Sequence, residues 1–93
     1  MRVPSISDLK TAIRIYYENI ELGTKEIMEL FNCKKSKATL LKKPVREAMA
    51  ENNILAWNAT RVNTQTAYQT WGIDIKDLEE RLARLTKLKL SER

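Results

Sequence analysis

The sequence predicts a mainly α-helical fold, and three observations support this prediction. Apolar side chains recur at the helical spacing of three and four residues in several segments. The 93 residues include only two glycines and two prolines, too few for a loop-rich or all-β design. The apolar content of 43% and the charged content of 31% are those of an ordinary folded chain, and the length indicates one domain.

Two helices are expected in the first third of the chain. Residues 6–20 place apolar side chains on one face, and Ser5 or Ser7 is expected to cap the start of this helix. Thr24 is a good N-cap for a second helix, in which the apolar pattern continues. At Asn32 that pattern breaks. Because asparagine tolerates the left-handed backbone conformation, a sharp turn is predicted here.

The middle of the chain is expected to hold two more helices and a pair of strands. A third helix is predicted over about 35–43. Because Pro44 fits best at the first position of a helix, residues 44–52 are predicted to form a separate short one. Residues 54–57 and 60–63 could be two short strands joined by a two-residue turn, although that turn lacks the Asn-Gly signature.

The C-terminal part has the most regular pattern. Asn63 is expected to cap a brief helix that Gly72 ends, and Asp74 is expected to cap the last helix. In this last helix acidic residues gather in the first turns and basic residues follow, which complements the helix dipole. We therefore divide the chain into a main domain over residues 1–73 and an amphipathic helix over residues 74–93.

The last helix carries an apolar seam that has two interpretations. Its members recur at steps of three and four: Ile75, Leu78, Leu82 and Leu85. The seam is too short for an independent coiled coil, so it packs either on the body of its own chain or against the same helix of a second chain. We expect the second arrangement, a homodimer.

Positive charge is concentrated in one stretch of the chain. The net charge is +5, and the segment from Leu30 to Arg46 contains six basic residues and no acidic one. Like charges crowded on one helix repel, and a helix that needed only solubility would normally intersperse glutamates. The charge therefore favours a polyanionic partner. The alternative is a structural helical hairpin with a solvated basic face.

Residues 24–43 resemble the helix-turn-helix motif of phage and bacterial DNA-binding proteins. Inward-facing apolar positions on two helices, with a turn at Asn32 between them, carry the resemblance. The sequence departs from the family at Met28, where alanine is preferred, and at Asn32, where glycine is preferred. The resemblance implies double-stranded DNA as the partner, with a recognition helix over about 35–43 in the major groove.

The resemblance also implies roles for the outer residues of the second helix. Ser36, Thr39 and Leu40 become candidate base readers, with Leu40 against a thymine methyl group, and flanking basic residues suit phosphates. The candidate DNA-binding residues are Lys34, Lys35, Ser36, Lys37, Thr39, Leu40, Lys42, Lys43, Arg46 and Arg61. Because no arginine or glutamine lies at the centre of the face, the affinity is expected to depend strongly on salt.

The order of the elements is also similar to that of small winged-helix proteins of mobile elements, such as excisionase-like factors. A hairpin over 54–63 would be the wing, and Arg61 would touch the minor groove or the backbone. Trp57, Tyr68 and Trp71 are expected to close the core. The function that follows is that of a small transcriptional regulator of phage or mobile-element type. The alternatives are a protein interaction or assembly protein and a DNA-recognition subunit like that of phage small terminases.

Catalysis, cofactors and membrane insertion are not expected. The chain has no histidine, the commonest general base and metal ligand, and Cys33 has no plausible metal partners. We therefore expect no enzyme activity, cofactor, metal or small-molecule ligand. No run approaches twenty apolar residues, and residues 1–10 lack the apolar region of a signal peptide. A single cysteine suits a reducing cytoplasm.

Overall fold

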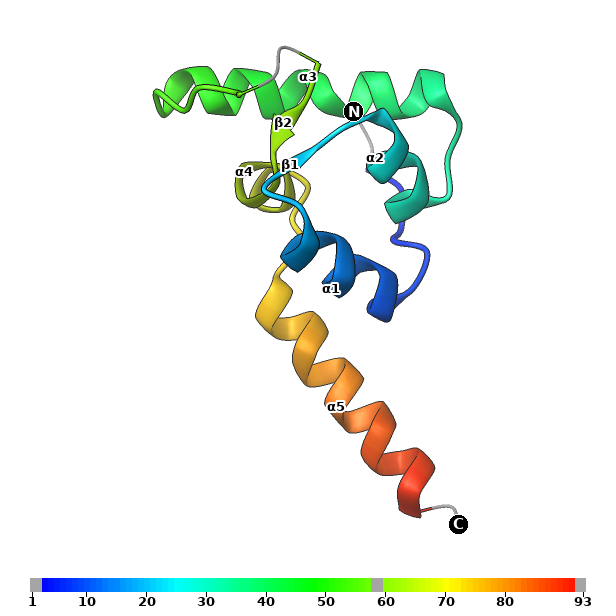
Figure 1. Ribbon diagram of the computed structural model, residues 1–93. Coiled ribbons are helices and arrows are strands. Elements are labelled where there is room, and N and C mark those ends of the chain that lie inside the picture. Colours follow the sequence, from blue (N-terminus) through cyan, green and yellow to red (C-terminus); the bar gives the residue numbers. More distant parts are fainter. Residues whose placement is uncertain (1–2, 58–59, 92–93) are drawn as a thin grey trace.

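The computed structural model describes residues 3–57 and 60–91 (Figure 1). The elements in chain order are α1 (Leu9–Glu18), β1 (Glu21–Leu22), α2 (Thr24–Phe31), α3 (Lys35–Glu51), β2 (Val62–Asn63), α4 (Thr64–Thr70) and α5 (Ile75–Ser91). The chain is mainly helical with one small antiparallel strand pair, which confirms the predicted fold class.

The first helix is capped by Asp8. The Asp8 carboxylate accepts a hydrogen bond from the Thr11 N–H (2.9 Å) and so satisfies a donor that the first turn leaves unpaired. The prediction that Ser5 or Ser7 caps α1 was therefore wrong. The Ser7 hydroxyl instead donates to the Glu29 carbonyl (3.0 Å), which ties the N-terminal segment to α2.

The second helix begins one residue earlier than its predicted cap implied. Thr24 is the first helical residue, and Gly23 is the N-cap. The Gly23 N–H donates to the Glu26 carboxylate (2.9 Å), the half of a capping box that needs no side chain at the cap. Asn32 ends α2 in the left-handed conformation (φ 51°, ψ 51°), and this confirms the predicted turn.

The third helix continues through Pro44, so the prediction of two separate helices was wrong. Proline cannot donate the backbone hydrogen bond that would normally reach Leu40. The helix survives because one apolar face runs unbroken across the proline and is buried on both sides of it: Ala38, Leu41, Val45 and Met49. Packing on both sides of the proline therefore outweighs the missing bond.

The strands do not form the predicted hairpin over 54–63. β2 pairs in antiparallel fashion with β1, and Leu22 lies opposite Val62. Both side chains are fully buried, so the pairing brings two apolar residues from distant parts of the chain into the core. Residues 54–57 form no strand, and the turn predicted at 58–59 lies outside the described residues.

Two of the three aromatic residues that were predicted to close the core, Tyr68 and Trp71, are buried there. The Tyr68 hydroxyl donates to the Ala12 carbonyl (2.6 Å), and the Trp71 indole N–H donates to the Leu41 carbonyl (3.0 Å). Each polar end thus finds a partner inside the fold, which confirms the core prediction for both residues. The same prediction was wrong for Trp57, whose side chain is 80% exposed.

The last helix leaves the body of the molecule after its first turns (Figure 1). Leu78 is buried against the core, Leu82 is half-buried, and Leu85 is 46% exposed. Arg81 and Arg84 form the expected pairs with carboxylates one turn earlier in the helix. The N-terminal half of α5 therefore packs on α1, and its C-terminal half extends away.

Candidate nucleic-acid interface

The corner between α2 and α3 is held by a small apolar contact. Ile27, Leu30 and Phe31 of α2 are buried, as are Ala38 and Leu41 of α3. Alanine at the crossing lets the two helix backbones approach closely. The left-handed turn at Asn32 joins the two helices at this corner.

The outer face of the first half of α3 is basic and exposed. Its exposed members are Lys34, Lys35, Ser36, Thr39, Leu40, Lys43 and Arg46, and Lys37 is half-buried beside them. Leu40 is 46% exposed although it is apolar. The Thr39 hydroxyl donates to the Lys35 carbonyl (3.0 Å), so it lies close against the helix and is able to exchange this bond for another.

The start of α3 adds a second source of positive potential. Lys34 is the N-cap and makes no side-chain hydrogen bond to the helix. The positive end of the helix dipole therefore lies beside three lysines, Lys34, Lys35 and Lys37. Phosphate oxygens are the groups that such a helix start attracts.

Lys42 is turned inward, so the structure does not place it among the outer lysines. Its side chain is only 5% exposed, and its ammonium group donates to the Thr24 hydroxyl (2.7 Å) and the Thr60 carbonyl (2.8 Å). Burial, together with the positive charges of Arg46 and Arg61, lowers the pKa of Lys42. The sequence-based assignment of Lys42 to phosphate contact is therefore corrected: it joins α3 to α2 and to the segment before β2.

Arg61 is also occupied within the fold. Its guanidinium pairs with the Glu26 carboxylate (2.5 Å) and donates to the Glu21 carbonyl (3.2 Å). This half-buried pair fixes β2 beside the start of α2. Arg61 therefore lies at the base of the strand pair, and its predicted place on an extended wing was wrong.

The segment after α3 presents two apolar side chains that sequence reasoning did not assign to any surface. Leu55 is 87% exposed and Trp57 is 80% exposed. The Trp57 N–H donates to the Glu21 carboxylate (2.6 Å), which anchors the backbone of this segment. In the sequence, Trp57 lies in a stretch without neighbouring charges, which was the available signal for this surface. The same pattern is typical of a core residue, so it did not distinguish the two.

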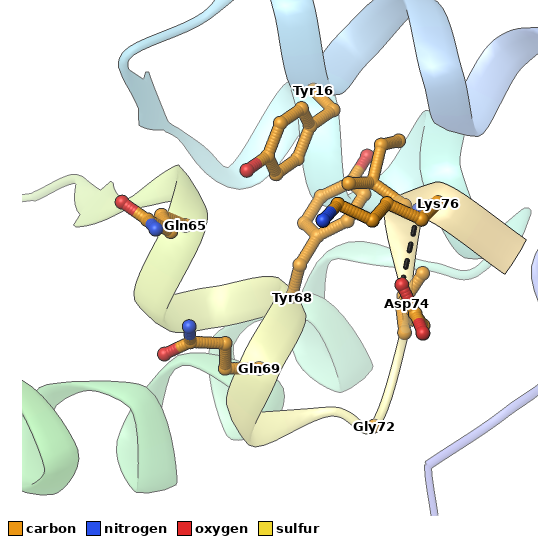
Figure 2. A pocket seen from close by; sticks show the side chains of 9 residues that line it. Tyr16, Gln65, Tyr68, Gln69, Gly72, Asp74 and Lys76 are labelled. Atoms are coloured by element: carbon orange, nitrogen blue, oxygen red, sulfur yellow. Dashed lines mark hydrogen bonds between the residues drawn. The ribbon is translucent and has the colours of Figure 1, made fainter. Parts of the chain in front are cut away.

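A hollow lies between α1, α4 and the start of α5 (Figure 2). Its volume is about 570 Å³, and Tyr16, Gln65 and Gln69 are among the residues that line it. The Asp74 carboxylate, which also lines it, accepts from the Lys76 N–H (3.0 Å), the bond drawn in Figure 2, and so caps α5 as predicted.

Within residues 3–57 and 60–91, no cluster of histidine, cysteine or carboxylate side chains could hold a metal ion. None of the helices in that described part is both long enough and apolar enough to cross a bilayer. Burial raises the pKa of the Cys33 thiol, which leaves it poorly suited to act as a nucleophile.

Comparison with known proteins adds no family assignment. The chain matches no protein-family model, no curated protein and no solved structure. The functional argument therefore rests on the residues and their geometry.

Proposed function

We propose that this protein binds double-stranded DNA, with the first half of α3 in the major groove. The observation that carries the proposal is the exposed, acid-free basic face of residues 34–46, presented at a corner that the left-handed turn at Asn32 sets. A B-DNA major groove is wide enough for one helix, and duplex DNA offers the phosphates that the lysines require.

The side chains on this face divide by chemistry. Lys34, Lys35 and Lys43 are long, exposed cations that suit phosphate oxygens on either side of the groove. Thr39 and Leu40 are short, exposed and central, so they are the residues that would meet base edges. Lys42 and Arg61 have a different role in this proposal, because they hold the helix pair and the strand pair in position.

The biological setting that fits best is that of a small cytoplasmic transcriptional regulator of phage or mobile-element type. A helix-turn-helix unit on a short chain gives weak binding to one half-site. Two copies joined by α5 would bind two half-sites at once, which raises affinity without new contacts.

The test is fluorescence anisotropy of a labelled duplex at several salt concentrations. The double variant Lys35→Ala/Lys43→Ala should flatten the plot of log affinity against log salt by about 1.8, the value for two lost phosphate contacts. The matched control is Lys10→Ala/Lys76→Ala, which removes two exposed lysines elsewhere and should leave the slope almost unchanged. Absence of binding at low salt, or equal flattening in both variants, would contradict the proposal.

Base reading by Thr39 has its own test. Thr39→Ala should reduce the discrimination between a selected duplex and a scrambled one, because the hydroxyl contributes to one base contact. An equal loss of affinity for both duplexes would mean that Thr39 touches a phosphate.

The second candidate function is protein assembly, and the exposure of Leu55 and Trp57 favours it. Two large apolar side chains on one short segment are typical of a contact surface for another protein. The same titration separates the two functions, because an assembly protein would show no salt-dependent affinity for the duplex.

A further inference from the structure

We propose that the projecting half of α5 is a docking surface for a second copy of this chain, and that the two α5 helices lie antiparallel. The proposal does not depend on DNA binding. It rests on three features of α5: an apolar strip that continues past the body, a groove beside that strip, and the separation of charge along the helix.

The apolar strip starts in the core and ends in solvent. Leu78 is buried and Leu82 is half-buried, whereas Leu85 and Leu88 are 46% and 58% exposed. Both residues belong to the C-terminal half of α5 (Ile75–Ser91), the half that extends away from the body in Figure 1. A helix that needed only to be solvated would carry polar residues there, so this strip requires a partner surface.

A groove beside the strip is the matching surface on the other copy. It lies between α1 and α5 and has a volume of about 480 Å³. Its apolar lining residues are Ile13, Leu82 and Ala83, and Glu79, Thr86 and Lys87 complete it. Its lining is mostly apolar, as side chains such as Leu85 and Leu88 require. In a two-fold arrangement each copy would offer its leucines to the groove of the other, so the contact closes on itself.

The distribution of charge decides the direction of the two helices. Residues 74–80 contain four acidic residues and one basic residue, and residues 81–91 contain four basic residues and no acidic one. A parallel pair would set acid against acid and base against base. An antiparallel pair that crosses between Leu82 and Leu85 sets each acidic half against the basic half of its partner.

The helix dipole alone does not account for this charge separation. Its effect falls off within the first and last turns. Glu79, Glu80, Arg81 and Arg84 lie in the interior turns of α5, yet the sign of charge still changes sharply between residues 80 and 81. Within one chain Arg81 and Arg84 form exposed pairs one turn apart, with Asp77 (2.8 Å) and Glu80 (3.8 Å), and Glu79 accepts a hydrogen bond from the Tyr17 hydroxyl of α1. In the two-chain arrangement, the separation of charge along α5 sets opposite charges of the two chains against each other.

The first experiment measures the mass of the full chain by sedimentation equilibrium between about 5 and about 200 µM. The range extends to high concentration because one helix face buries less area than a standard interface of about 1,600 Å², which implies weak association. We expect the wild-type mass to rise with concentration from 10.8 kDa towards twice that value. Leu85→Asn/Leu88→Asn should stay at the monomer mass with unchanged circular dichroism, since both side chains are already exposed. The control Leu55→Asn removes a still more exposed leucine elsewhere and should associate like the wild type.

The second experiment decides the direction by distances between spin labels on two copies. Labels are attached through Lys76→Cys or Arg84→Cys in a Cys33→Ser background, at positions that are exposed. In an antiparallel pair the two Arg84 positions lie near the crossing, and the two Lys76 positions are about 20 Å apart along the helix axes at 1.5 Å per residue. The Lys76 distance should therefore exceed the Arg84 distance by at least about 10 Å.

Each alternative outcome overturns the proposal. A wild-type chain that remains a monomer at every concentration rules out the second copy as the partner. A Leu85→Asn/Leu88→Asn variant that associates like the wild type places the interface elsewhere. Equal distances for the two label positions mean a parallel pair. A monomer that still binds DNA would leave the proposed DNA binding by α3 intact while removing this inference and the two-copy arrangement on the DNA.

Discussion

Replacing Lys42 with methionine separates lysines that support the fold from lysines that face outward on α3. Methionine has a similar length and keeps the apolar stem, but it removes the ammonium group. The neighbouring residue Lys43 is exposed and provides a matched control, because Lys43→Met makes the same chemical change one position further along the helix.

The expected magnitudes follow from the two environments. Lys42→Met deprives the Thr24 hydroxyl and the Thr60 carbonyl of their donor, which costs about 1–2 kcal/mol for partly buried groups. Part of this cost is offset because an ammonium group no longer has to be buried. A net loss of about 1 kcal/mol lowers the Tm of a domain of this size by roughly 4–8 °C.

The assays are thermal unfolding and the salt dependence of duplex binding. Lys42→Met should lower the Tm and leave the salt slope unchanged, whereas Lys43→Met should leave the Tm unchanged and reduce the slope by about 0.9. The reasoning is refuted if Lys42→Met reduces the slope by the same amount as Lys43→Met, since that result would mean that Lys42 contacts phosphate.

Three further predictions concern the fold and its dependence on pH. Pro44→Ala should raise stability by about 1–2 kcal/mol in denaturant titrations, because it restores a backbone donor inside α3; a lower stability would mean that the proline is required. Asn32→Ala should cost about 1 kcal/mol in the same assay, because alanine tolerates the left-handed conformation less well, and Asn32→Gly should cost less. Burial raises the pKa of Tyr68, so the folded chain keeps a phenol proton that the unfolded chain releases near pH 10. Stability should therefore fall as the pH rises above about 10, and Tyr68→Phe should show a smaller fall.

The helix-turn-helix corner could be predicted from the sequence because its signals are local. Asn32 interrupts an apolar helical pattern, and the preference of asparagine for the left-handed conformation belongs to the residue itself. The exposed positions of the first half of α3 follow from helical spacing once the inward face is known. The predicted pairs of α5 were correct for the same reason, since i and i+4 residues meet in any helix.

Three of the predictions that were wrong depended on contacts with other parts of the chain. Pro44 begins a helix by its own preference, but the buried residues before and after it hold α3 continuous. Val62 pairs with Leu22, forty residues earlier, and no local turn signal could indicate that pairing. Trp57 was expected in the core, but Tyr68 and Trp71 fill the core and the Trp57 side chain is exposed.

The sequence by itself determined the helical class, the turn at Asn32 and the acid-free basic stretch, because each depends on residue preferences and on spacing along one element. Only the tertiary structure decided which basic residues face outward. Lys42 and Lys43 are neighbours of the same type, and successive residues of a helix point about 100° apart. The ammonium group of the inward side chain, Lys42, donates to the Thr24 hydroxyl and the Thr60 carbonyl, while the outward side chain, Lys43, is exposed.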